Sequence, residues 1–508
     1  MNLNIKINRR IEMKLRDYIE RLKNEGLDAE IRVPGKQTPA AEDLEQEIEW
    51  LSCDSRDVKP GTLFVCKGVA FKPEYLQQAV EKGAVAYAQG KDIRRAMAIF
   101  ANMFFEDPWK DMALIGVTGT KGKSTTLYYI RAILEHSKIC GPDRFGFVST
   151  IDTYDGINRF QSHLTTPEII ELTEHLANMR TSGIKIGGIE VSSQALKYDR
   201  VYGYKFSHGV FVSFGQDHIG STEHPDVEDY FRSKLMLFDR SDVAVVNLSN
   251  RRIAEVIEAA RQCRKIYCCT EENLRKEGGE VCFDAVIYDG IPAPYAKEGD
   301  KPAVKRVVKG IRLSMPGLFN AENASEAAAV AMDLGATEEE VVNGLKGVLV
   351  EGRMEFYENK ERDVIAIADY AHNEISCRKL LESARTEYPG YRLEVVVGFP
   401  GGKGIQRRVD IPKVTAELAD FTWITEEDPA NEDLLEICNE AYGNLVKFGG
   451  KGCICPNRQE AAKRAILEAK PKTVVMIIGK GSEAYAYRKG VYYPVPADTE
   501  LARKYIKM

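Results

Sequence analysis

The chain has 508 residues, which is too long for a single hydrophobic core and favours two to four domains. Hydrophobic residues make up 44% and charged residues 29%, as in ordinary globular proteins, and the formal net charge of -6 argues against non-specific binding to nucleic acid or anionic lipid. No stretch approaches the roughly 20 apolar residues that cross a bilayer, and the first residues lack the apolar core of a signal peptide. We therefore expect a cytoplasmic protein that neither spans a membrane nor binds nucleic acid.

The first 110 residues mix short strand-like runs, at 62–65 and 84–88, with helical stretches such as 74–82. The apolar run 113–117 then indicates a buried strand. It leads into a glycine-rich turn and a helix from about 124 to 136, which is the strand–loop–helix order of a nucleotide-binding unit.

Further apolar runs alternate with helical patterns, at 184–191, 209–214 and 243–248. The alternation restarts after about residue 350, with strands expected at 364–368, 393–397, 421–425 and 473–478. Such alternation predicts parallel sheets with helices on their faces. The expected fold class is therefore α/β with three domains. These are a smaller N-terminal domain over 1–110, a central P-loop domain over 111–350 and a C-terminal doubly wound, Rossmann-like domain over 351–508.

Cysteine and histidine form no recognisable metal or redox motif. The eleven cysteines include no C-x-x-C pair, and the seven histidines include no H-E-x-x-H. We expect reduced, mostly buried thiols.

The glycine-rich loop is the strongest local signal, and it comprises Gly119, Thr120, Lys121, Gly122, Lys123, Ser124 and Thr125. Glycines let successive backbone N–H groups turn toward one anion, and the helix that follows adds its dipole. Lys123 can reach the β- and γ-phosphates of a nucleotide, and the Ser124 hydroxyl can bind Mg²⁺. The strict pattern has another glycine where Val117 stands, so this is a variant loop. A turn that binds nothing is the alternative, and we predict an ATP site.

Nine motifs in order resemble the Mur ligase family over nearly the whole chain. They are DSRDVKPGTLFVC from Asp54, TTPE from Thr165, EVSS from Glu190, DH at Asp217, DYFRSK from Asp229, MPGLFNAENA from Met315, GRME from Gly352, DYAH from Asp369 and GKGSE from Gly479. The likeness is closest to MurE-type members, which add the third residue to UDP-N-acetylmuramoyl-L-alanyl-D-glutamate. The resemblance implies an ATP-dependent ligase of peptidoglycan precursor synthesis, which activates a carboxylate as an acyl phosphate that an amine then displaces.

The resemblance also implies a set of metal ligands. Ser124, Glu190 and His218 match the family's Mg²⁺ ligands, and hard oxygens plus an imidazole suit that ion. Glu190 ends an apolar strand, at the sheet edge where ligands bind. A solvated or capping role is the alternative for both Glu190 and His218.

Lys234 shares the apolar face of its helix, because Phe231, Lys234, Leu235 and Phe238 follow the spacing i, i+3, i+4, i+7. Desolvation favours a neutral amine, and only a neutral amine reacts with carbon dioxide. The resemblance implies that Lys234 is carbamylated and presents a carboxylate to the metal ions. A lysine that snorkels to the edge of the face is the alternative.

For ATP, the resemblance adds Asn320, Asn323, Arg353 and Asp369. For the UDP-muramyl dipeptide it adds Ser55 and Arg56 at the uridine, and Thr165, Thr166, Ser192 and Arg200 at the muramyl peptide. An ordinary surface ion pair is the alternative for Arg353, and Thr165 could instead cap the helix that begins near Pro167.

The chain departs from the family near the expected substrate site. Gln194 stands where a histidine is frequent, and Tyr198 where a glutamine is frequent. The stretch from Asp217 to His224 also differs from the usual D-H-L-D-Y-H. These changes weaken the transfer of the sugar-peptide contacts more than that of the ATP site.

A motif in the third domain bears on which amino acid is added. Members that add meso-diaminopimelate carry an arginine where this chain has Ala430. Acidic residues surround that position, namely Glu427, Asp428, Glu432 and Asp433, with Asn431 between them. An acidic environment favours an ammonium side chain, so we expect L-lysine, with ornithine second, while a solvated acidic loop is the alternative. Gly479 and Glu483 match positions that hold the incoming amino group.

Two other functions stay open. The first is a related ligase with another acceptor, such as a folylpolyglutamate synthetase, although the segment from Asp54 argues against it. The second is a non-catalytic ATP-binding regulator, although the joint presence of Lys123, Glu190, His218 and Lys234 argues against decay. We expect a monomer whose partners are ATP, the UDP-muramyl dipeptide and a free amino acid.

Overall fold

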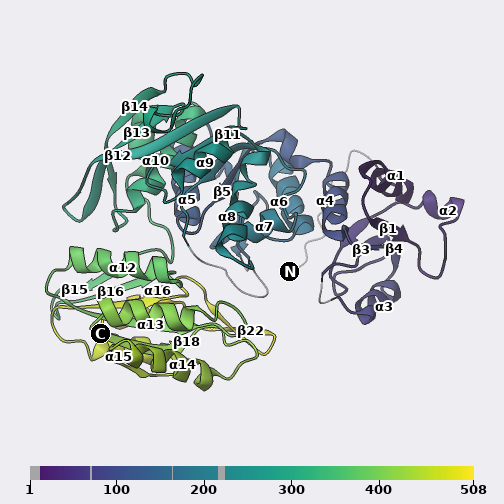
Figure 1. The fold of residues 1–508 in the computed structure, drawn as a ribbon. Helices are drawn as coiled ribbons and strands as arrows, with labels where there is room; N and C mark the ends of the chain where they lie inside the picture. Colours follow the sequence, from purple (N-terminus) through teal and green to yellow (C-terminus); the bar gives the residue numbers. More distant parts are fainter. Residues whose placement is uncertain (1–11, 69–70, 163, 216–223) are drawn as a thin grey trace. The chain divides into compact units, whose positions relative to one another are not determined.

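The computed structural model describes residues 12–508 except 69–70, 163 and 216–223. The chain groups into two compact units. Unit 1 comprises Met1–Gly116, Asp143–His208 and Asp239–Asp242, and unit 2 comprises Val117–Pro142, Gly209–Phe238 and Val243–Met508. Both units combine sheets with covering helices, so the α/β fold class is confirmed (Figure 1).

The N-terminal part of unit 1 is a small sheet with helices. Its elements are α1 (Leu15–Glu25), β1 (Ala29–Arg32), α2 (Ala41–Leu44), β2 (Trp50–Ser52), β3 (Thr62–Val65), α3 (Pro73–Glu81), β4 (Ala84–Gly90) and α4 (Ile93–Phe104). The strand order is β1-β4-β3-β2, and only the β1–β4 pair is antiparallel. Pro73 begins α3, where a missing N–H costs nothing. Helix α4 is largely buried because it packs against β2, β4 and α6 (Ile169–Thr181).

A ten-stranded sheet follows in the order β14-β13-β12-β11-β10-β5-β9-β6-β7-β8. Its first elements are η1 (Pro108–Asp111), β5 (Ala113–Thr118), α5 (Lys123–His136), β6 (Phe145–Val148), β7 (Asp152–Tyr154), β8 (Arg159–Gln161), α6, β9 (Ile186–Glu190), α7 (Ser193–Lys197) and β10 (Phe206–Phe211). The remainder are α8 (Val227–Leu235), η2 (Phe238–Arg240), β11 (Ser241–Asn247), α9 (Ile253–Ala260), β12 (Lys265–Glu277), β13 (Glu280–Asp289), η3 (Ala293–Tyr295), β14 (Val304–Leu313), α10 (Asn320–Asp333) and α11 (Glu338–Leu345).

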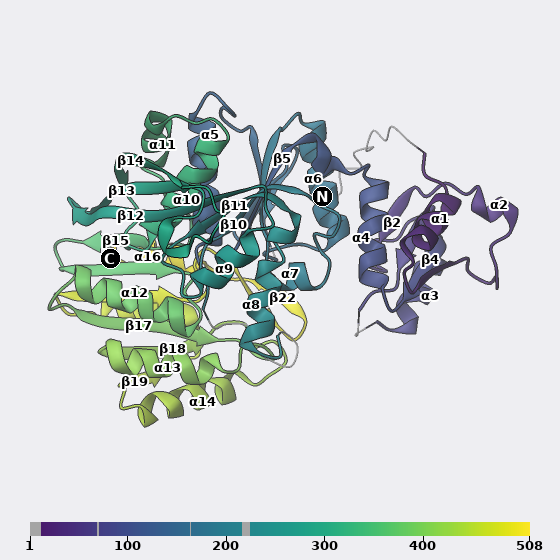
Figure 2. The ribbon, with the colours of Figure 1, turned by 45° about the horizontal axis from the view of Figure 1, so that its top comes forward.

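Three long strands, β12, β13 and β14, pair antiparallel and were not predicted. Helices α10 and α11 pack against them (Figure 2). Many side chains of β14 and of the outer half of β12 are exposed. An antiparallel sheet tolerates one solvated face in this way. The parallel pairs β6–β9 and β11–β12 agree with the predicted parallel sheet, which these antiparallel strands extend.

The C-terminal part of unit 2 has a six-stranded sheet in the order β15-β16-β20-β17-β18-β19, antiparallel only at β15. Its elements are β15 (Glu355–Asn359), β16 (Val364–Asp369), α12 (Glu374–Glu387), β17 (Arg392–Phe399), α13 (Arg407–Leu418), β18 (Phe421–Glu426), α14 (Leu434–Lys447), β19 (Gly452–Ile454), α15 (Arg458–Leu467), β20 (Thr473–Ile478), β21 (Tyr485–Arg488), β22 (Val491–Pro494) and α16 (Asp498–Tyr505). Helices α12, α13 and α14 share one apolar core with the sheet, and α15 and α16 share another. The predicted doubly wound arrangement is therefore confirmed.

The three larger sheets fall within the predicted ranges 1–110, 111–350 and 351–508, and the two-stranded sheet of β21 and β22 lies in the last of them. The two compact units divide the chain elsewhere. The domain boundaries thus stay a prediction. All eleven cysteines are free thiols, as expected. Among the described residues, no helix is both long and apolar enough to cross a membrane.

Candidate functional site

The glycine-rich loop joins β5 to the first turn of α5, where Ser124 and Thr125 are buried. Gly119 and Gly122 have φ of +153° and +88°, which side chains rarely allow. A Cβ on Gly122 would lie 2.3 Å from Asn323 Oδ1, and a Cβ on Gly119 would lie 2.9 Å from a backbone nitrogen of the neighbouring segment. Both glycines are therefore required for the loop to fold against its neighbours.

Replacing Gly122 with alanine should lower the free energy of unfolding by about 1–3 kcal/mol, because the new Cβ adds a clash to a strained φ. The same change should weaken ATP binding, since the loop must shift. Urea unfolding and calorimetry with ATP would measure both effects. Gly141→Ala is the matched control, because Gly141 also has a positive φ but its Cβ would meet nothing within 4 Å. Equal losses in the two variants would show that the contact with Asn323 is unimportant.

The Lys123 ammonium donates to the carbonyls of Gly119 (3.0 Å) and Thr120 (3.3 Å), so it lies within the loop. Two other side chains of the loop, those of Ser124 and Lys121, contact the C-terminal part of unit 2. The Ser124 hydroxyl accepts a hydrogen bond from Arg353 Nη2 at 3.2 Å, and Lys121 Nζ lies 3.4 Å from His372 Nε2. Arg353 therefore lies at the predicted phosphate site, and the surface ion pair considered as its alternative role does not describe it.

Two asparagines predicted for ATP begin α10 beside this loop. Asn323 donates to Asn320 Oδ1 at 3.1 Å, and Asn320 donates to the carbonyl of Pro316 at 2.7 Å. Both asparagines are almost fully buried. The contact between Asn323 and Gly122 joins α10 to the loop, so the structure brings these predicted ATP residues together.

Asp369 ends β16, and its carboxylate faces backbone. It accepts hydrogen bonds from the N–H groups of Met354 (2.8 Å) and Ala371 (2.7 Å). Burial raises the pKa of Asp369, an effect that the nearby Arg353 guanidinium opposes. Asp369 thus fixes the turn that carries Arg353, whose guanidinium lies 4.3 Å from the centre of the Tyr370 ring.

Lys234 is buried against the glycine-rich loop. Its side chain is 2% exposed, and its Nζ donates to the carbonyl of Gly119 at 2.9 Å and lies 4.4 Å from the centre of the Tyr230 ring. Phe231 is buried on the same helix, as the spacing predicted. Helix α8 ends at Leu235, so Phe238 belongs to the short helix η2 rather than to α8. The amine is therefore too enclosed for the snorkelling alternative.

In unit 1, Glu190 ends β9 and is completely buried. The backbone N–H and the hydroxyl of Thr150 each donate to one Glu190 carboxylate oxygen at 2.9 Å. The Thr150 hydroxyl also lies 3.1 Å from that of Thr165, and the Thr166 hydroxyl donates to the Glu190 carbonyl at 2.7 Å. Glu190 is therefore anchored, which excludes the solvated alternative, and Thr150 is a site residue that the sequence reasoning missed.

Ser192 and Arg200 lie close to these threonines. The Ser192 side chain caps α7, and Arg200 Nη1 donates to the carbonyl of Thr166 at 3.0 Å. The capping role considered for Thr165 is wrong, because α6 has Glu168 at its N-cap and no side-chain hydrogen bond there. The predicted muramyl-peptide residues thus lie together in unit 1.

The predicted uridine residues differ in exposure. Ser55 is buried, and its hydroxyl donates to Gln78 Oε1 at 3.0 Å. Arg56 points outward with a side chain that is 87% exposed and pairs with Asp54. Lys82 donates to the Ser55 carbonyl at 2.8 Å and so supports this turn.

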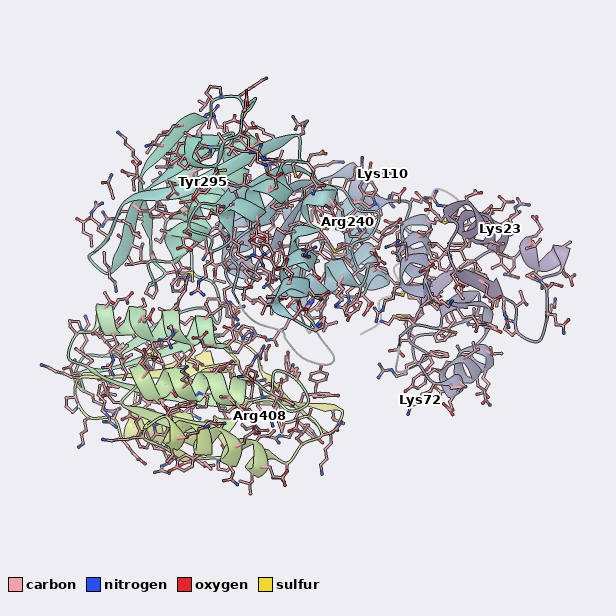
Figure 3. The ribbon with its side chains drawn as sticks, viewed as in Figure 1. Lys23, Lys72, Lys110, Arg240, Tyr295 and Arg408 are labelled. Atoms are coloured by element: carbon pink, nitrogen blue, oxygen red, sulfur yellow. The ribbon has the colours of Figure 1, made fainter. Side chains whose placement is uncertain are left out.

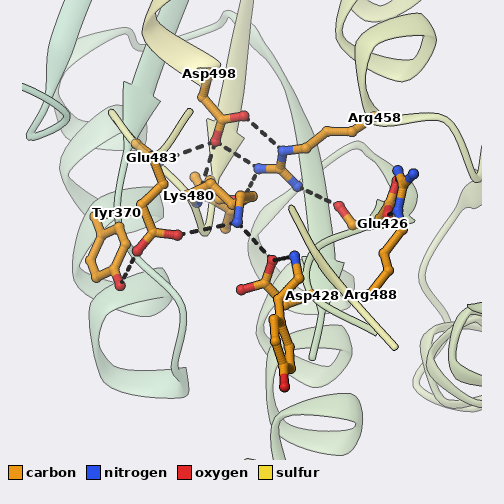
Figure 4. A network of polar contacts seen from close by, with 11 residues as sticks. Tyr370, Glu426, Asp428, Arg458, Lys480, Glu483, Arg488 and Asp498 are labelled. Atoms are coloured by element: carbon orange, nitrogen blue, oxygen red, sulfur yellow. Dashed lines mark hydrogen bonds and ion pairs between the residues drawn. The ribbon is translucent and has the colours of Figure 1, made fainter. Parts of the chain in front are cut away.

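A buried polar network occupies the C-terminal part (Figure 4). Lys480 donates to Asp428 (2.9 Å) and Glu483 (3.2 Å), and Glu483 also accepts from the Tyr370 hydroxyl at 2.7 Å. Arg458 pairs with Asp498 at 2.7 Å. The charges of Asp428 and Glu483 are thus shared with a buried lysine.

The rest of the acidic stretch is also compensated, which corrects the expected excess of negative charge. Glu432 pairs at 2.8 Å with Arg408, a buried arginine of α13 labelled in Figure 3. Asp433 caps α14, and Asn431 is exposed. The compensating cations come from segments that are distant in sequence, so counting the acidic residues of this stretch alone overestimated its negative charge.

Glu427 is different, because its carboxylate accepts no hydrogen bond within the part of the chain that the structure describes. Burial, with a smaller contribution from the neighbouring Asp428, raises the pKa of Glu427 to about 7, although Arg407, Lys480 and Arg458 oppose the rise. A Cβ on Gly479 would lie 3.1 Å from Glu427 Oε2, so the two predicted amino-acid residues are neighbours.

Hydroxyl and carboxylate oxygens are hard ligands, so Ser124 and Glu190 have the donor chemistry that Mg²⁺ requires. Each Glu190 oxygen keeps a lone pair beyond its bond from Thr150. The third predicted ligand, His218, lies outside the described residues. Within those residues, no group of three His, Cys, Asp or Glu side chains is placed to hold a metal ion, so a site would need ligands of other kinds, such as Ser124.

Comparisons with known proteins agree with this arrangement. Residues 117–331 match the Mur ligase middle domain, and residues 352–481 match the Mur ligase glutamate ligase domain. A UDP-N-acetylmuramyl-tripeptide synthetase from Lactobacillus delbrueckii subsp. bulgaricus is 34% identical, covering 93% of this chain and 96% of its own. A UDP-N-acetylmuramoyl-L-alanyl-D-glutamate–L-lysine ligase from Enterococcus faecalis is also 34% identical, covering 91% and 92%.

Among solved structures, a UDP-N-acetylmuramoyl-L-alanyl-D-glutamate–2,6-diaminopimelate ligase shares the fold, with a TM-score of 0.57, 20% identity, and coverage of 98% of this chain and 99% of its own. The match to both family models and the two relatives at 34% identity lead to one conclusion. The chain belongs to the Mur ligase family.

Proposed function

We propose that this protein joins L-lysine to UDP-N-acetylmuramoyl-L-alanyl-D-glutamate and converts ATP to ADP and phosphate in doing so. The relatives at 34% identity, named as a tripeptide synthetase and an L-lysine ligase, support the acceptor and the reaction. The observation that carries the catalytic part is the buried Lys234 amine on the Gly119 carbonyl, because a structural loop gains nothing from a desolvated lysine.

The proposed reaction has two steps. A carboxylate oxygen of the D-glutamyl residue attacks the γ-phosphorus of ATP, and ADP leaves. The amine of the incoming amino acid, having lost its ammonium proton, then attacks the carbonyl carbon and phosphate leaves. Lys123 and Arg353 would offset the negative charge that collects around the transferred phosphoryl group. Bound Mg²⁺ would supply further charge neutralisation, and the family resemblance implies Ser124, Glu190 and His218 as its ligands.

We also propose that Lys234 carries a carbamate. The Lys234 ammonium first loses a proton, and the neutral nitrogen then bonds to the carbon of carbon dioxide and loses a second proton. A buried cation is thereby converted into a buried carboxylate. The closeness of Lys234 to the phosphate loop supports this role, because a carboxylate there can orient a bound cation.

Specificity for lysine would rest on Glu427 rather than on a broadly acidic surface. An ammonium side chain would keep this carboxylate ionised, while Ala430 offers no guanidinium for a second carboxylate. In a panel of amino acids at equal concentration, we expect turnover with lysine to exceed that with ornithine and to exceed that with meso-diaminopimelate by about tenfold or more. Phosphate release should require ATP, the UDP-muramyl dipeptide and the amino acid together.

Ala430→Arg alone should not create activity with meso-diaminopimelate, because Glu427 still disfavours a carboxylate and Ala430 has a φ of +52° that its hydrogen bonds fix. Glu427→Gln is the companion variant and should reduce the advantage of lysine. Higher incorporation of meso-diaminopimelate than of lysine by the unaltered protein would refute the specificity, and nucleotide binding without turnover would refute the ligase.

A further inference from the structure

A buried arginine, Arg458 of α15, joins two strand ends in the C-terminal part of unit 2 (Figure 4). Its Nη1 donates at 3.0 Å to the carbonyl of Glu426, the last residue of β18. Its Nη2 donates at 2.8 Å to the carbonyl of Ile478, the last residue of β20. Glu427 and Gly479, both predicted to bind the incoming amino acid, directly follow these two carbonyls. One guanidinium therefore fixes the backbone immediately before each of them.

The two strands do not pair with each other, because β17 lies between them in the sheet. Their backbones therefore run roughly 10 Å apart, which is twice the spacing of neighbouring strands. Each of them pairs with β17, and that pairing ends at Glu426 on one side and at Ile478 on the other. The side chain of Arg458 thus links two segments at the point where both leave the hydrogen-bond ladder of the sheet.

Arg458 is itself held by Asp498 in the first turn of α16. Its Nε and Nη2 each donate at 2.7 Å to one carboxylate oxygen of Asp498, which is the bidentate geometry of a strong ion pair. The same carboxylate accepts the backbone N–H groups of Lys480 (3.3 Å) and Gly481 (3.2 Å). These two residues begin the turn that leads to Glu483, a third residue predicted to hold the amino acid. Asp498 therefore ties this turn to the guanidinium.

This set of contacts requires an arginine. A guanidinium carries five N–H donors in a fixed plane, so it reaches two carbonyls and both oxygens of a carboxylate at once. A lysine in its place would keep the positive charge, but its three donors share one nitrogen and cannot reach all four acceptors. Lysine at position 458 therefore removes the geometry of the link and retains its charge.

The charge of Arg458 also acts on Glu427. Burial and the neighbouring Asp428 raise the pKa of Glu427. Arg407, Lys480 and Arg458 oppose that rise with their positive charges. A variant that keeps a cation at position 458 consequently separates the position of Glu427 from its ionisation.

We propose that Arg458 and Asp498 are positioning residues for the incoming amino acid, which they do not touch. They set the separation between Glu427 and the turn from Gly479 to Glu483, so that both segments can bind one small substrate together. The identity of that substrate rests on the proposed function. ATP is proposed to bind at the separate glycine-rich loop, so its binding should not depend on this pair.

The test compares Arg458→Lys and Asp498→Asn with the unaltered full-length protein, with L-lysine and ATP varied in turn. Each variant should raise KM for L-lysine by about tenfold or more and leave KM for ATP unchanged, because small misplacements of binding groups have large effects. Asp498→Asn keeps the shape of the side chain and removes the charge that holds the guanidinium. A merely structural role would reduce the amount of folded enzyme, and hence the apparent kcat, without changing KM for L-lysine.

Arg362→Lys is the matched control. Arg362 also donates to backbone carbonyls, those of Ile466 (2.8 Å) and Leu467 (3.0 Å). It precedes β16 and therefore lies at the opposite end of the parallel strands of the same sheet. Its replacement should lower the midpoint of thermal unfolding and leave KM for L-lysine unchanged.

Hydrogen exchange measures the positioning without any turnover. The backbone amides of 427–430 and 479–483 should exchange faster in Arg458→Lys than in the unaltered protein, and Arg362→Lys should not change them. Unchanged exchange with an unchanged KM for L-lysine would overturn the proposal. Faster exchange with an unchanged KM would also overturn it, because the two segments would then not bind the amino acid. Faster exchange in Arg458→Lys, when the unaltered protein ligates no amino acid, would refute the proposed function and leave the link between the two segments standing.

Discussion

Lys123→Ala should lower kcat for ligation by about a hundredfold to a thousandfold, the usual cost of removing one charged or hydrogen-bonding group that stabilises a transition state. The Lys123 ammonium donates to the carbonyls of Gly119 and Thr120, which are uncharged acceptors that the negatively charged phosphates of ATP would replace. A coupled assay of phosphate release, with ATP varied, would separate the fall in kcat from a rise in KM.

Lys138→Ala is the matched control for that variant, because Lys138 follows the other end of α5 and is exposed. It should retain full activity and the same midpoint of thermal unfolding. Peptide-bond formation by Lys123→Ala at the rate of this control would contradict the assignment of the loop to ATP.

Lys234→Met should reduce kcat by about a hundredfold or more while the protein stays folded, since methionine fills a similar volume without the amine. The reason is the proposed carbamate, which methionine cannot form. Protein equilibrated with isotopically labelled carbon dioxide should show one carbamate carbon signal by nuclear magnetic resonance, and Lys234→Met should lack it. Activity of the unaltered protein should fall when dissolved carbon dioxide is removed and return when it is restored.

Arg232→Met controls for changes to the same helix, because the Arg232 side chain is 76% exposed. If the labelled protein shows no carbamate signal while ligation proceeds at full rate, the lysine acts as an unmodified amine. If Lys234→Met ligates like Arg232→Met, the lysine has no catalytic part at all.

Much of the fold could be predicted because its strands are continuous apolar runs. The runs at 364–368 and 473–478 became the buried strands β16 and β20, which apolar composition alone defines. The strands β12 and β14 were missed because much of each is charged and exposed, whereas β13 was missed although it is mostly apolar and buried. The pair Gly278-Gly279, which joins β12 to β13 with positive φ at both glycines, is typical of a tight hairpin turn. A search for apolar runs did not detect it. The run at 209–214 was displaced, since β10 ends at Phe211.

Site residues could be predicted where they are close together in the sequence. They could not be predicted where folding brings distant segments together. The loop glycines followed from spacing, and Arg353 and Asn323 followed from resemblance. Thr150 lies forty residues before Glu190 in the chain, so no periodicity connects them. The same limit explains the acidic stretch at Glu427, whose compensating cations Lys480 and Arg408 come from other elements.

The hairpin of β21 and β22 has a bearing on how substrate choice can change in this family. Asp428 accepts from the Tyr487 backbone N–H at 3.0 Å, the Ala430 N–H donates to the Tyr487 carbonyl at 3.1 Å, and the Lys489 N–H donates to the Ala430 carbonyl at 2.7 Å. Two segments far apart in the gene therefore behave as one module. A chimaera that exchanges residues 427–433 without 485–494 would lose the fit between these backbone hydrogen bonds. Amino-acid selectivity can therefore be transferred only when both segments are exchanged together.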